Sequence, residues 1–468
     1  MVMRKGVDFL VIGGGPDGHR AAIEAGRAGS SVLLVEQGPV LGGECVARGT
    51  IPSKTLRETA TYLAGLRDRC EGVLDVELAA DTKVAGLMGR MKAVRENHET
   101  YMNAQVDCSS IDRLHGRVSF LGPHKVEVSL RDGGRKKVTA RHVIIATGSR
   151  PRDPENVPID HELILDSDSI LSLMYLPRTL AVLGSGVIAC EFASIFAAIG
   201  VQVTMIDKRV RPLDFLDPEL SDEFLRSFEE RGGTYIGSAG WESVEADGYE
   251  VRIDLGSGEV HKFDKCLCAL GRVANVDDLN LSAAGIDLDE KGVIPVDEFG
   301  RTETPSIYAV GDVVGPPALA ATAVMQGRNA VRHALDMSIG DTSNQTPTGI
   351  YTIPDIASIG LTEGEARERH GEVFVGRASF AEVTKGQISG NEHGFLKLIV
   401  STEGYILGAQ IAGEGATELI HLAQMAMFAN LTVDAFLQNA FNFPTLAEAY
   451  RVAALSVSSQ IVQRQRAG

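Results

Sequence analysis

The chain has 468 residues, which allows two to four domains, and its 44% hydrophobic and 23% charged content is that of an ordinary globular protein. Its formal net charge of −17 argues against nucleic acid or an anionic membrane surface as a partner, because both are bound by concentrated Lys and Arg. No apolar stretch is long enough for a signal peptide or a transmembrane helix, and we therefore expect a cytoplasmic protein.

The six cysteines of the chain are scattered and include no CxxC pair. This spacing indicates neither a zinc site nor a disulfide framework of the secreted type. Cys266 and Cys268 alternate on a predicted buried strand, where we expect them to share a face as small hydrophobic residues. Metal binding by this pair is the weaker interpretation, so no metal cofactor is predicted.

A dinucleotide-binding pattern stands at the start of the chain. An apolar run over residues 7–12 ends in the glycine turn Gly13-Gly-Gly-Pro-Asp-Gly18, a helical pattern follows, and a second apolar run over residues 32–35 ends at Glu36. In such a turn the three glycines allow the tight bend, the approach of a pyrophosphate and the packing of the helix; here they are Gly13, Gly15 and Gly18. Glu36 is predicted to accept hydrogen bonds from a ribose hydroxyl. Asp17 replaces a usual glycine, and we interpret it as tolerated because an acid suits the first turn of a helix.

The same pattern recurs in the middle of the chain. A predicted strand over residues 179–183 leads into a glycine turn, and a helix and a strand over residues 201–206 follow. The spacing is identical in the two copies, since positions 13, 15, 18 and 36 correspond to Gly184, Gly186, Ala189 and Asp207. Two copies at equal spacing predict two bound dinucleotides.

The segment after the second copy is compatible with both NAD and NADP. Asp207 suits the ribose of NAD, whereas the Lys208, Arg209 and Arg211 side chains could pair with the 2′-phosphate of NADP. For Arg211 a solvated loop residue is an equally good interpretation, and for Lys208 and Arg209 it is a weaker one.

The remaining segments complete the predicted organisation. Apolar residues at helical spacing predict an amphipathic helix over residues 84–106; they are Val84, Leu87, Met91, Val94 and Tyr101. Residues 116–143 alternate in short runs typical of strands, and a Pro-rich linker follows at residues 151–158. A further predicted strand over residues 306–310 ends in Gly311-Asp312, and the composition changes again from about residue 345.

The stretch from Leu41 to Lys54 holds one cysteine, Cys45, with Thr50 five positions later and an Ile-Pro-Ser-Lys ending. With the two glycine patterns, the Ala-Thr-Gly148 turn, Gly311-Asp312 and residues 441–448, it resembles the flavoprotein disulfide reductases, the family of glutathione reductase and lipoamide dehydrogenase. The resemblance covers essentially the whole chain.

This resemblance implies an α/β fold with two Rossmann-like dinucleotide-binding domains, for FAD and NAD(P), and a C-terminal α+β dimerisation domain. The implied FAD domain has two parts, residues 1–155 and 276–345, which flank an NAD(P) domain over residues 156–275. Residues 346–468 would form the interface domain of a homodimer or a higher homo-oligomer.

The resemblance also implies roles for single residues. Lys54 and Glu191 match a pair beside the flavin and the nicotinamide, where a cation would stabilise developing negative charge, and Thr50 completes the predicted catalytic set. The residues predicted to bind FAD are Gly13, Gly15, Gly18, Glu36, Gly43, Cys45, Gly116, Thr147, Gly148, Gly311, Asp312 and Ala320. Those predicted to bind NAD(P) are Gly184, Gly186, Val187, Ala189, Asp207, Lys208, Arg209, Gly271 and Arg272.

Two positions depart from the family. Thr50 stands where the family has its flavin-proximal cysteine, and a hydroxyl cannot carry out thiol–disulfide exchange. Phe443 stands where the family has an acid–base histidine, so Glu448, which would orient that histidine, is expected to be structural. Electrons could therefore enter the flavin but could not continue to a dithiol.

These departures lead to a predicted reaction. NAD(P)H would reduce FAD, and a second nucleotide, NAD(P)+, would then take the hydride at the same face in ping-pong kinetics. A diaphorase or NAD(P)H oxidase that passes electrons to quinone or oxygen is the main enzymatic alternative. A sulfenate cycle at Cys45 and a non-enzymatic, inactive lipoamide dehydrogenase homologue are weaker alternatives.

Overall fold

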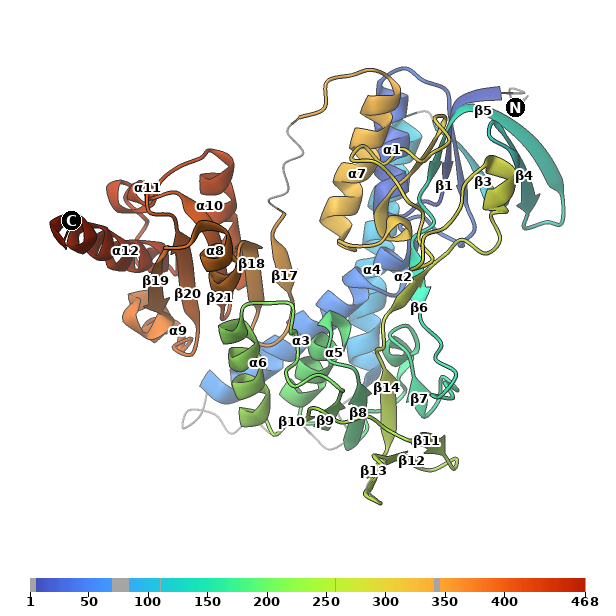
Figure 1. Cartoon of the computed structure of the whole chain (residues 1–468). Coiled ribbons are helices and arrows are strands. Elements are labelled where there is room, and N and C mark those ends of the chain that lie inside the picture. The colour runs from blue at the N-terminus through green and yellow to red at the C-terminus, as the bar shows by residue number, and fades with distance from the viewer. Residues whose placement is uncertain (1–5, 70–83, 110, 257, 341–345, 468) are drawn as a thin grey trace. The chain divides into compact units, whose positions relative to one another are not determined.

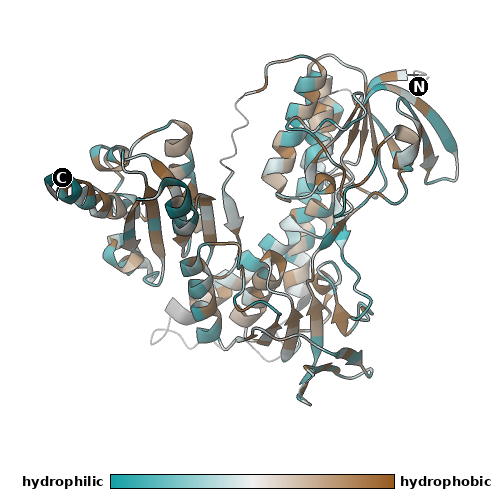
Figure 2. Cartoon of the chain, viewed as in Figure 1, coloured by the Kyte–Doolittle hydropathy of each residue, from teal (hydrophilic) through white to brown (hydrophobic). Residues whose placement is uncertain are grey.

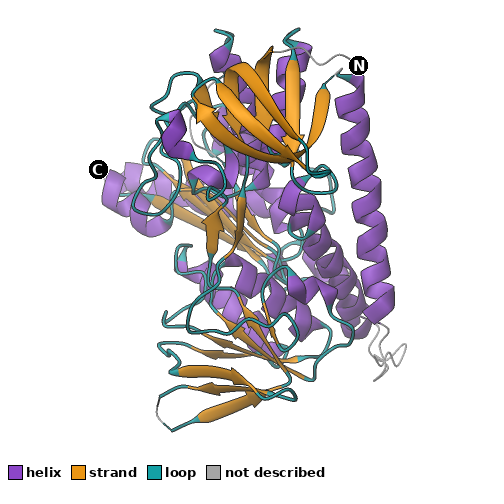
Figure 3. Cartoon of the chain, turned by 90° about the vertical axis from the view of Figure 1, so that its right-hand side faces the viewer, coloured by secondary structure: helices purple, strands orange, loops and turns teal. Residues whose placement is uncertain are grey.

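The computed structural model describes residues 6–69, 84–109, 111–256, 258–340 and 346–467, so Cys70 lies outside the described residues. The chain divides into two compact units, which both combine helices and strands (Figure 3). The first unit comprises Met1–Thr55, Ala85–Asp153 and Leu270–Thr342. The second comprises Leu56–Val84, Pro154–Ala269 and Ser343–Gly468.

The first unit is built on a six-stranded sheet (Figure 1). Its strands are β1 (Gly6–Ile12), β2 (Val32–Glu36), β3 (Asp112–Gly122), β4 (Lys125–Leu130), β5 (Arg135–Ile145) and β16 (Ile307–Ala309). Strand β1 pairs in parallel with β2 and β5, β16 pairs in parallel with β5, and the start of β3 pairs in parallel with β2. Strand β4 joins β3 to β5 in antiparallel pairing.

The central strands of this sheet are apolar on both faces. Phe9 and Val11 pack with the helices α1 (Pro16–Arg27) and α7 (Ala320–Ala334), which lie side by side, whereas Leu10 and Ile12 pack with apolar residues of β3, β4 and β5. Parallel strands that are covered on both sides read as continuous apolar runs, which explains the unbroken apolar run over residues 9–12. Figure 2 shows both hydrophobic and hydrophilic residues along the strands of this sheet.

Further elements of the first unit surround the sheet. They are α2 (Gly43–Ala47), the start of α3 (Thr50–Arg69), α4 (Val84–Cys108), β6 (Ser149–Pro151), β15 (Arg272–Ala274), η2 (Leu281–Ala284) and η3 (Gly311–Val314). Helix α4 confirms the helix predicted over residues 84–106, but the predicted apolar face is wrong in part. Tyr101 is 58% exposed, and the buried apolar side chains that the structure describes on α4 are Met91, Met102 and Val106.

The second unit contains a five-stranded parallel sheet in the order β10-β9-β8-β14-β7. Its strands are β7 (Ile164–Leu165), β8 (Thr179–Leu183), β9 (Gln202–Ile206), β10 (Thr234–Ile236) and β14 (Lys265–Cys268). The adjoining elements are η1 (Ser169–Ser172), α5 (Val187–Ala198), α6 (Pro218–Glu230) and an antiparallel sheet of β11 (Ser243–Ala246), β12 (Val251–Asp254) and β13 (Val260–Phe263). Cys266 and Cys268 are buried on β14, as predicted.

The C-terminal part of the second unit is an antiparallel sheet with helices. The strands, in the order β17-β18-β21-β20-β19, are β17 (Thr348–Ile350), β18 (Ile356–Gly360), β19 (Phe374–Ser379), β20 (Phe395–Val400) and β21 (Ile406–Ala412). The helices are α8 (Glu363–His370), η4 (Phe380–Glu382), α9 (Thr384–Ser389), α10 (Ala416–Phe428), α11 (Asp434–Gln438) and α12 (Glu448–Ala467). The predicted fold class is thereby confirmed. Within the described ranges no helix has the length and apolar content that crossing a membrane requires.

Candidate functional site

The first glycine turn joins β1 to α1 in a strained backbone geometry. Gly13 has a φ of +103°, a left-handed value that favours glycine, and its N–H donates to the Val35 carbonyl at 2.8 Å. A Cβ on Gly13 would overlap the Ala146 carbonyl, and one on Gly18 would overlap the Gly13 carbonyl. Among the described residues no N-cap side chain serves the N-terminus of α1. Its first residue, Pro16, has no N–H, and the Gly18 N–H donates to Asp17 Oδ1, so an anion here would meet the N–H of Asp17 and the positive end of the helix dipole.

Glu36 lies at the end of β2 and is 8% exposed. Its two carboxylate oxygens accept hydrogen bonds from the N–H groups of Gly14 and Gly38, both at 2.6 Å. A cavity of about 70 Å³, lined in part by Leu41 and His115, lies beside it. A carboxylate offers about four acceptor positions, so these two bonds leave capacity for a ribose hydroxyl. That role stays a prediction.

The end of β16 and the turn after β5 come together in the same unit. Gly311 has a φ of +76°, and its N–H donates to Gln326 Oε1 at 2.8 Å. The Asp312 carboxylate accepts a hydrogen bond from the Ser149 hydroxyl at 2.7 Å. The buried hydroxyl oxygen of Thr147 has no hydrogen-bond partner among the described residues. An orphan hydroxyl, a glycine cradle and an open helix N-terminus fit a bound dinucleotide such as FAD.

Asp17 is more deeply buried than the sequence suggested, with 5% exposure. Its Oδ1 accepts a hydrogen bond from the Gly18 N–H at 2.9 Å, and its other oxygen lies where a Cβ on Gly311 would fall. Burial raises the pKa of Asp17 to about 7; the Gly18 hydrogen bond lowers this pKa, and the charges of Asp312 and Glu36 raise it. The helix dipole therefore does not decide the charge of this acid, and our interpretation from the sequence was incomplete.

Helix α2 carries Cys45, and α3 begins at Thr50. A Cβ on Gly43 would come within 3.0 Å of Gly15 Cα, which places the start of α2 close against the first glycine turn. Burial raises the pKa of the Cys45 thiol and outweighs its hydrogen bond with Thr50 and the charge of Lys54, both of which lower this pKa. Cys45 is a free cysteine, and at neutral pH it is a protonated thiol.

Four more predicted positions have local structural roles. Gly116 lies where β3 changes its partner from β2 to β4, and a Cβ there would press on the Ser129 carbonyl. Ala320 begins α7. The Arg272 guanidinium donates to the hydroxyl and carbonyl oxygens of Ser149, both at 2.8 Å, and the Gly271 carbonyl accepts from the Arg152 N–H at 3.0 Å. Their roles in binding FAD or NAD(P) stay predictions.

The second glycine turn repeats the geometry of the first. Gly184 has a φ of +114°, and its N–H donates to the Ile206 carbonyl at 3.0 Å, the counterpart of the Gly13–Val35 bond. Gly186 precedes α5, whose first residue is Val187, and Ala189 is fully buried. The two glycine turns found in the sequence thus share the same backbone geometry.

The loop after β9 holds Asp207 and the three predicted basic residues. Asp207 is 8% exposed, and its Oδ1 accepts a hydrogen bond from the Arg209 N–H at 2.7 Å. Two acids that the sequence analysis did not single out bind the arginines: Arg209 pairs with Asp214 at 3.1 Å and Arg211 with Asp222 at 3.1 Å. Lys208 is exposed, and no ion pair to it is found in the part of the chain that the structure describes.

Glu191 lies on α5 and is 5% exposed. Its Oε1 accepts a hydrogen bond from the Tyr351 N–H at 2.9 Å, and the Ser194 hydroxyl accepts one from the Ile353 N–H at 3.2 Å. The segment around β17 therefore lies against α5. Lys54 belongs to the first unit and Glu191 to the second, so their predicted pairing stays a prediction.

The structure also describes Phe443, the C-terminal departure from the family, and the nearby Glu448. Phe443 is 65% exposed. Glu448 begins α12, and its buried Oε2 has no hydrogen-bond partner among the residues that are described. The expectation that Glu448 is structural is not tested by this geometry.

The chain is similar to known proteins over nearly its whole length. Residues 7–327 match the family described as pyridine nucleotide-disulphide oxidoreductase, and residues 346–454 match its dimerisation domain. A soluble pyridine nucleotide transhydrogenase of Mycobacterium bovis is 39% identical over 97% of both chains. The crystal structure of LpdA from Mycobacterium tuberculosis has a TM-score of 0.90 at 27% identity, over 96% of this chain and 99% of that one. The HOCl-induced flavoprotein disulfide reductase RclA from Escherichia coli has a TM-score of 0.87 at 25% identity, over 96% and 100%.

Proposed function

The chain belongs to the pyridine nucleotide-disulphide oxidoreductase family, and from this membership we propose that it transfers hydride between NADPH and NAD+, or NADH and NADP+, without a redox disulfide. It is an FAD-dependent oxidoreductase that uses nicotinamide nucleotides. When bound, FAD takes up a hydride from one nucleotide and passes it to another. The name of the Mycobacterium bovis relative supports this reaction. The hydrogen bond of Cys45 with Thr50 is the observation that supports the absence of a redox disulfide.

Cys45 cannot form a redox-active disulfide with its side-chain partner. Its side-chain partner is a hydroxyl, which does not exchange with disulfides, and burial keeps the thiol protonated. Thiolates, not thiols, are the nucleophiles in sulfur redox chemistry, so a sulfenate cycle at Cys45 is also disfavoured. Phe443 offers no titratable group for a thiol substrate. Both features support transfer between nucleotides.

The residues of the two glycine turns would hold the dinucleotides. For FAD these are the N–H groups at the start of α1 with Glu36 and Asp312, and for NAD(P) the N–H groups at the start of α5 with Asp207. Lys54 would supply a positive charge where negative charge develops. The Tyr351 N–H holds the Glu191 carboxylate in one orientation. One nucleotide must leave before the next binds at the same site, so the kinetics should be ping-pong.

An anaerobic experiment tests this proposal. The FAD-loaded enzyme is reduced with one equivalent of NADPH, and thio-NAD+ is then added while the flavin and thio-NADH absorbances are followed. We expect one thio-NADH per reduced flavin. In a separate assay with oxygen or quinone as the acceptor, turnover that exceeds nucleotide exchange would overturn the proposal in favour of a diaphorase or oxidase. No flavin reduction by NADPH or NADH would indicate a non-enzymatic protein.

Thr50→Cys should create an internal disulfide with Cys45 without creating lipoamide turnover. The hydrogen bond between the two side chains shows that they lie close together, but Phe443 still supplies no proton to a dithiol substrate. Thiols are titrated in the denatured protein before and after reduction. The variant should show two more thiols after reduction than before it. Thr50→Ser is the matched control and should gain none. Robust lipoamide reduction by the unaltered enzyme would contradict this account.

Lys208→Gln combined with Arg209→Gln should weaken the use of NADPH more than the use of NADH. Hydrogen bonds to charged groups contribute about 1.5–3 kcal/mol, so we expect a loss of roughly tenfold or more in kcat/KM for NADPH. Arg178→Gln, which alters a side chain that is 92% exposed, is the control and should change neither value. Equal losses for the two nucleotides would remove the assignment of these residues to the 2′-phosphate.

The proposal includes a homodimer formed by the C-terminal part. Residues 346–454 match a dimerisation domain, and large apolar side chains on α10 and α12 are exposed in the single chain, including Met425, Phe428 and Leu455. Such exposed apolar side chains are typical of a surface that a partner covers. The cytoplasmic location and any higher homo-oligomer remain predictions.

A further inference from the structure

The loop after β9 holds Arg209 between two carboxylates. Arg209 Nε lies 3.1 Å from Asp214 Oδ2, and a second guanidinium nitrogen lies 3.8 Å from Asp207 Oδ2. Asp207 is the acid that the proposed function assigns to the ribose, so the guanidinium lies next to the position of the 2′ substituent. The Arg209 side chain is 51% exposed and can therefore exchange ion-pair partners without leaving water.

Hydrogen bonds hold the backbone of Arg209, whereas its side chain is half-exposed. The Arg209 N–H donates to Asp207 Oδ1 at 2.7 Å, and its carbonyl accepts from the Tyr235 hydroxyl at 2.8 Å and from the Ser238 N–H at 3.0 Å. Three hydrogen bonds thus hold the point from which the guanidinium extends. Only rotation of the side chain is needed to move the charge from Asp214 to a ligand.

NADP(H) and NAD(H) should affect the Arg209–Asp214 ion pair differently. A 2′-phosphate attracts the guanidinium and repels Asp214, so its binding opposes the Arg209–Asp214 pair. A 2′-hydroxyl hydrogen-bonds to Asp207 and leaves the pair intact. We propose that Asp214 is a specificity-determining residue, which weakens NADP(H) relative to NAD(H) by competing for Arg209. This inference rests on the proposed function, in which one site must bind and release both nucleotides.

The neighbouring basic residues, Arg211 and Lys208, can be compared with Arg209. Arg211 pairs with Asp222 at 3.1 Å and has similar exposure, but no contact of its side chain with Asp207 is found among the described residues. Lys208 is exposed, and no ion pair of its side chain is found in the ranges that the structure covers, so it would act on the 2′-phosphate independently of Asp214. The competition is therefore specific to Arg209.

Binding of nucleotide fragments to the FAD-loaded enzyme tests the inference. The probes are 2′,5′-ADP and 5′-AMP, which differ by the 2′-phosphate, and titration calorimetry at constant ionic strength gives their Kd values. Asp214→Asn should lower the Kd of 2′,5′-ADP by about two- to fivefold, the range of an exposed ion pair, and leave that of 5′-AMP unchanged. Asp222→Asn removes the same charge from the other arginine and should change neither Kd. In an Arg209→Gln background, the gain from Asp214→Asn should disappear.

Three outcomes would overturn the inference: no gain from Asp214→Asn, an equal gain from Asp222→Asn, or a gain that persists without Arg209. Failure of both probes to bind the unaltered enzyme would instead overturn the proposed function of this domain. Asp214 is 51% exposed, so its substitution should leave the fold intact, and unchanged binding of 5′-AMP confirms this directly.

Discussion

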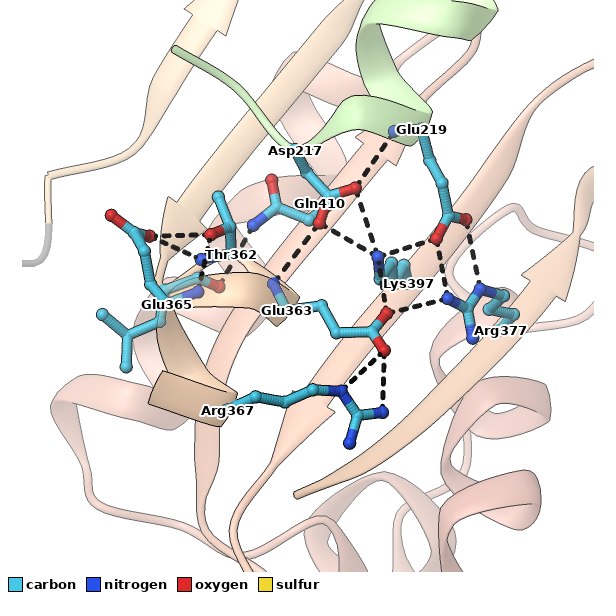
Figure 4. Close-up of polar contacts among 10 residues, drawn as sticks. Asp217, Glu219, Thr362, Glu363, Glu365, Arg367, Arg377, Lys397 and Gln410 are labelled. Atoms are coloured by element: carbon cyan, nitrogen blue, oxygen red, sulfur yellow. Dashed lines mark hydrogen bonds and ion pairs between the residues drawn. The ribbon is translucent and has the colours of Figure 1, made fainter. Parts of the chain in front are cut away.

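We expect Lys397→Met to lower the free energy of unfolding of the second unit by about 3–5 kcal/mol, because it removes the cation from a buried charge cluster. Lys397 and Asp217 are 2% and 1% exposed, and Lys397 Nζ lies 2.9 Å from Asp217 Oδ2. The same nitrogen contacts Glu219 at 2.7 Å and Glu363 at 2.9 Å. The three acids precede or begin α6 and α8, whereas Lys397 lies on β20, so the cluster connects three elements (Figure 4).

The charge of Lys397 is secured by these contacts. Burial alone would lower its pKa, but hydrogen bonds to Glu219, Asp217 and Glu363 outweigh burial and raise the pKa. Burial likewise acts to raise the pKa of Glu363, but contacts with Arg367, Lys397 and Arg377 lower it to about 2. In Lys397→Met, Asp217 would remain buried with an uncompensated charge, which costs more than the pair itself contributes.

Scanning calorimetry checks this prediction. The loss should appear as a decrease in Tm on the order of 10 °C for the transition of the second unit. Arg367→Gln is the matched control, since it removes an exposed i,i+4 pair with Glu363 from the same cluster and should cost about 0.5 kcal/mol. Adding Asp217→Asn to Lys397→Met should recover part of the loss. A Tm within a degree or two of the unaltered protein would show that the cluster does not stabilise this unit.

The features that the sequence predicted well are those in which local pattern and structure coincide. The two glycine turns were found because a strained φ, a tight bend and a following helix impose glycine at fixed spacing, and Gly13 and Gly184 adopt the same φ region and the same hydrogen bond. The strand over Thr179–Leu183 was predicted with its observed bounds because its apolar run is flanked by turn residues.

The features that the sequence did not predict depend on contacts between distant segments. Lys397 stands in an otherwise apolar strand, and nothing local indicates that its partners lie about 180 residues earlier at Asp217 and Glu219. The burial of Asp17 arises in part from Gly311, where a side chain would meet the Asp17 carboxylate, and from Gly327 on α7, where one would meet the Asp17 carbonyl. Spacing within one segment carries no information on such contacts, and family resemblance did not supply it, because Asp17 departs from the family pattern.

Asp17 should make FAD retention dependent on pH above neutrality. The pKa of Asp17 in the folded chain is about 7 instead of 3.8, so the folded protein keeps a proton that the unfolded chain releases. The associated stability is therefore fully present below pH 3.8 and is lost as the pH rises to about 7, in total about 4 kcal/mol. Asp312 and Glu36 face the same carboxyl group and add to this effect. In the proposed site, the FAD pyrophosphate would bring further negative charge to the start of α1.

A bound pyrophosphate and an ionised Asp17 repel each other, so FAD binding should require the protonated carboxyl group. Above pH 7 the affinity for FAD should then decrease by up to about tenfold for each pH unit, because one proton is taken up with each FAD bound. Asp17→Asn cannot ionise and should abolish this slope, with little change at pH 6 and a large gain in affinity at pH 8.5. The measurement is the Kd of FAD from flavin fluorescence across this pH range.

Asp107→Asn, an exposed acid of the same unit, is the control and should keep the slope of the unaltered protein. A slope that is equally steep in Asp17→Asn would show that another group takes up the proton, and a flat profile in the unaltered protein would show that Asp17 is far from the pyrophosphate.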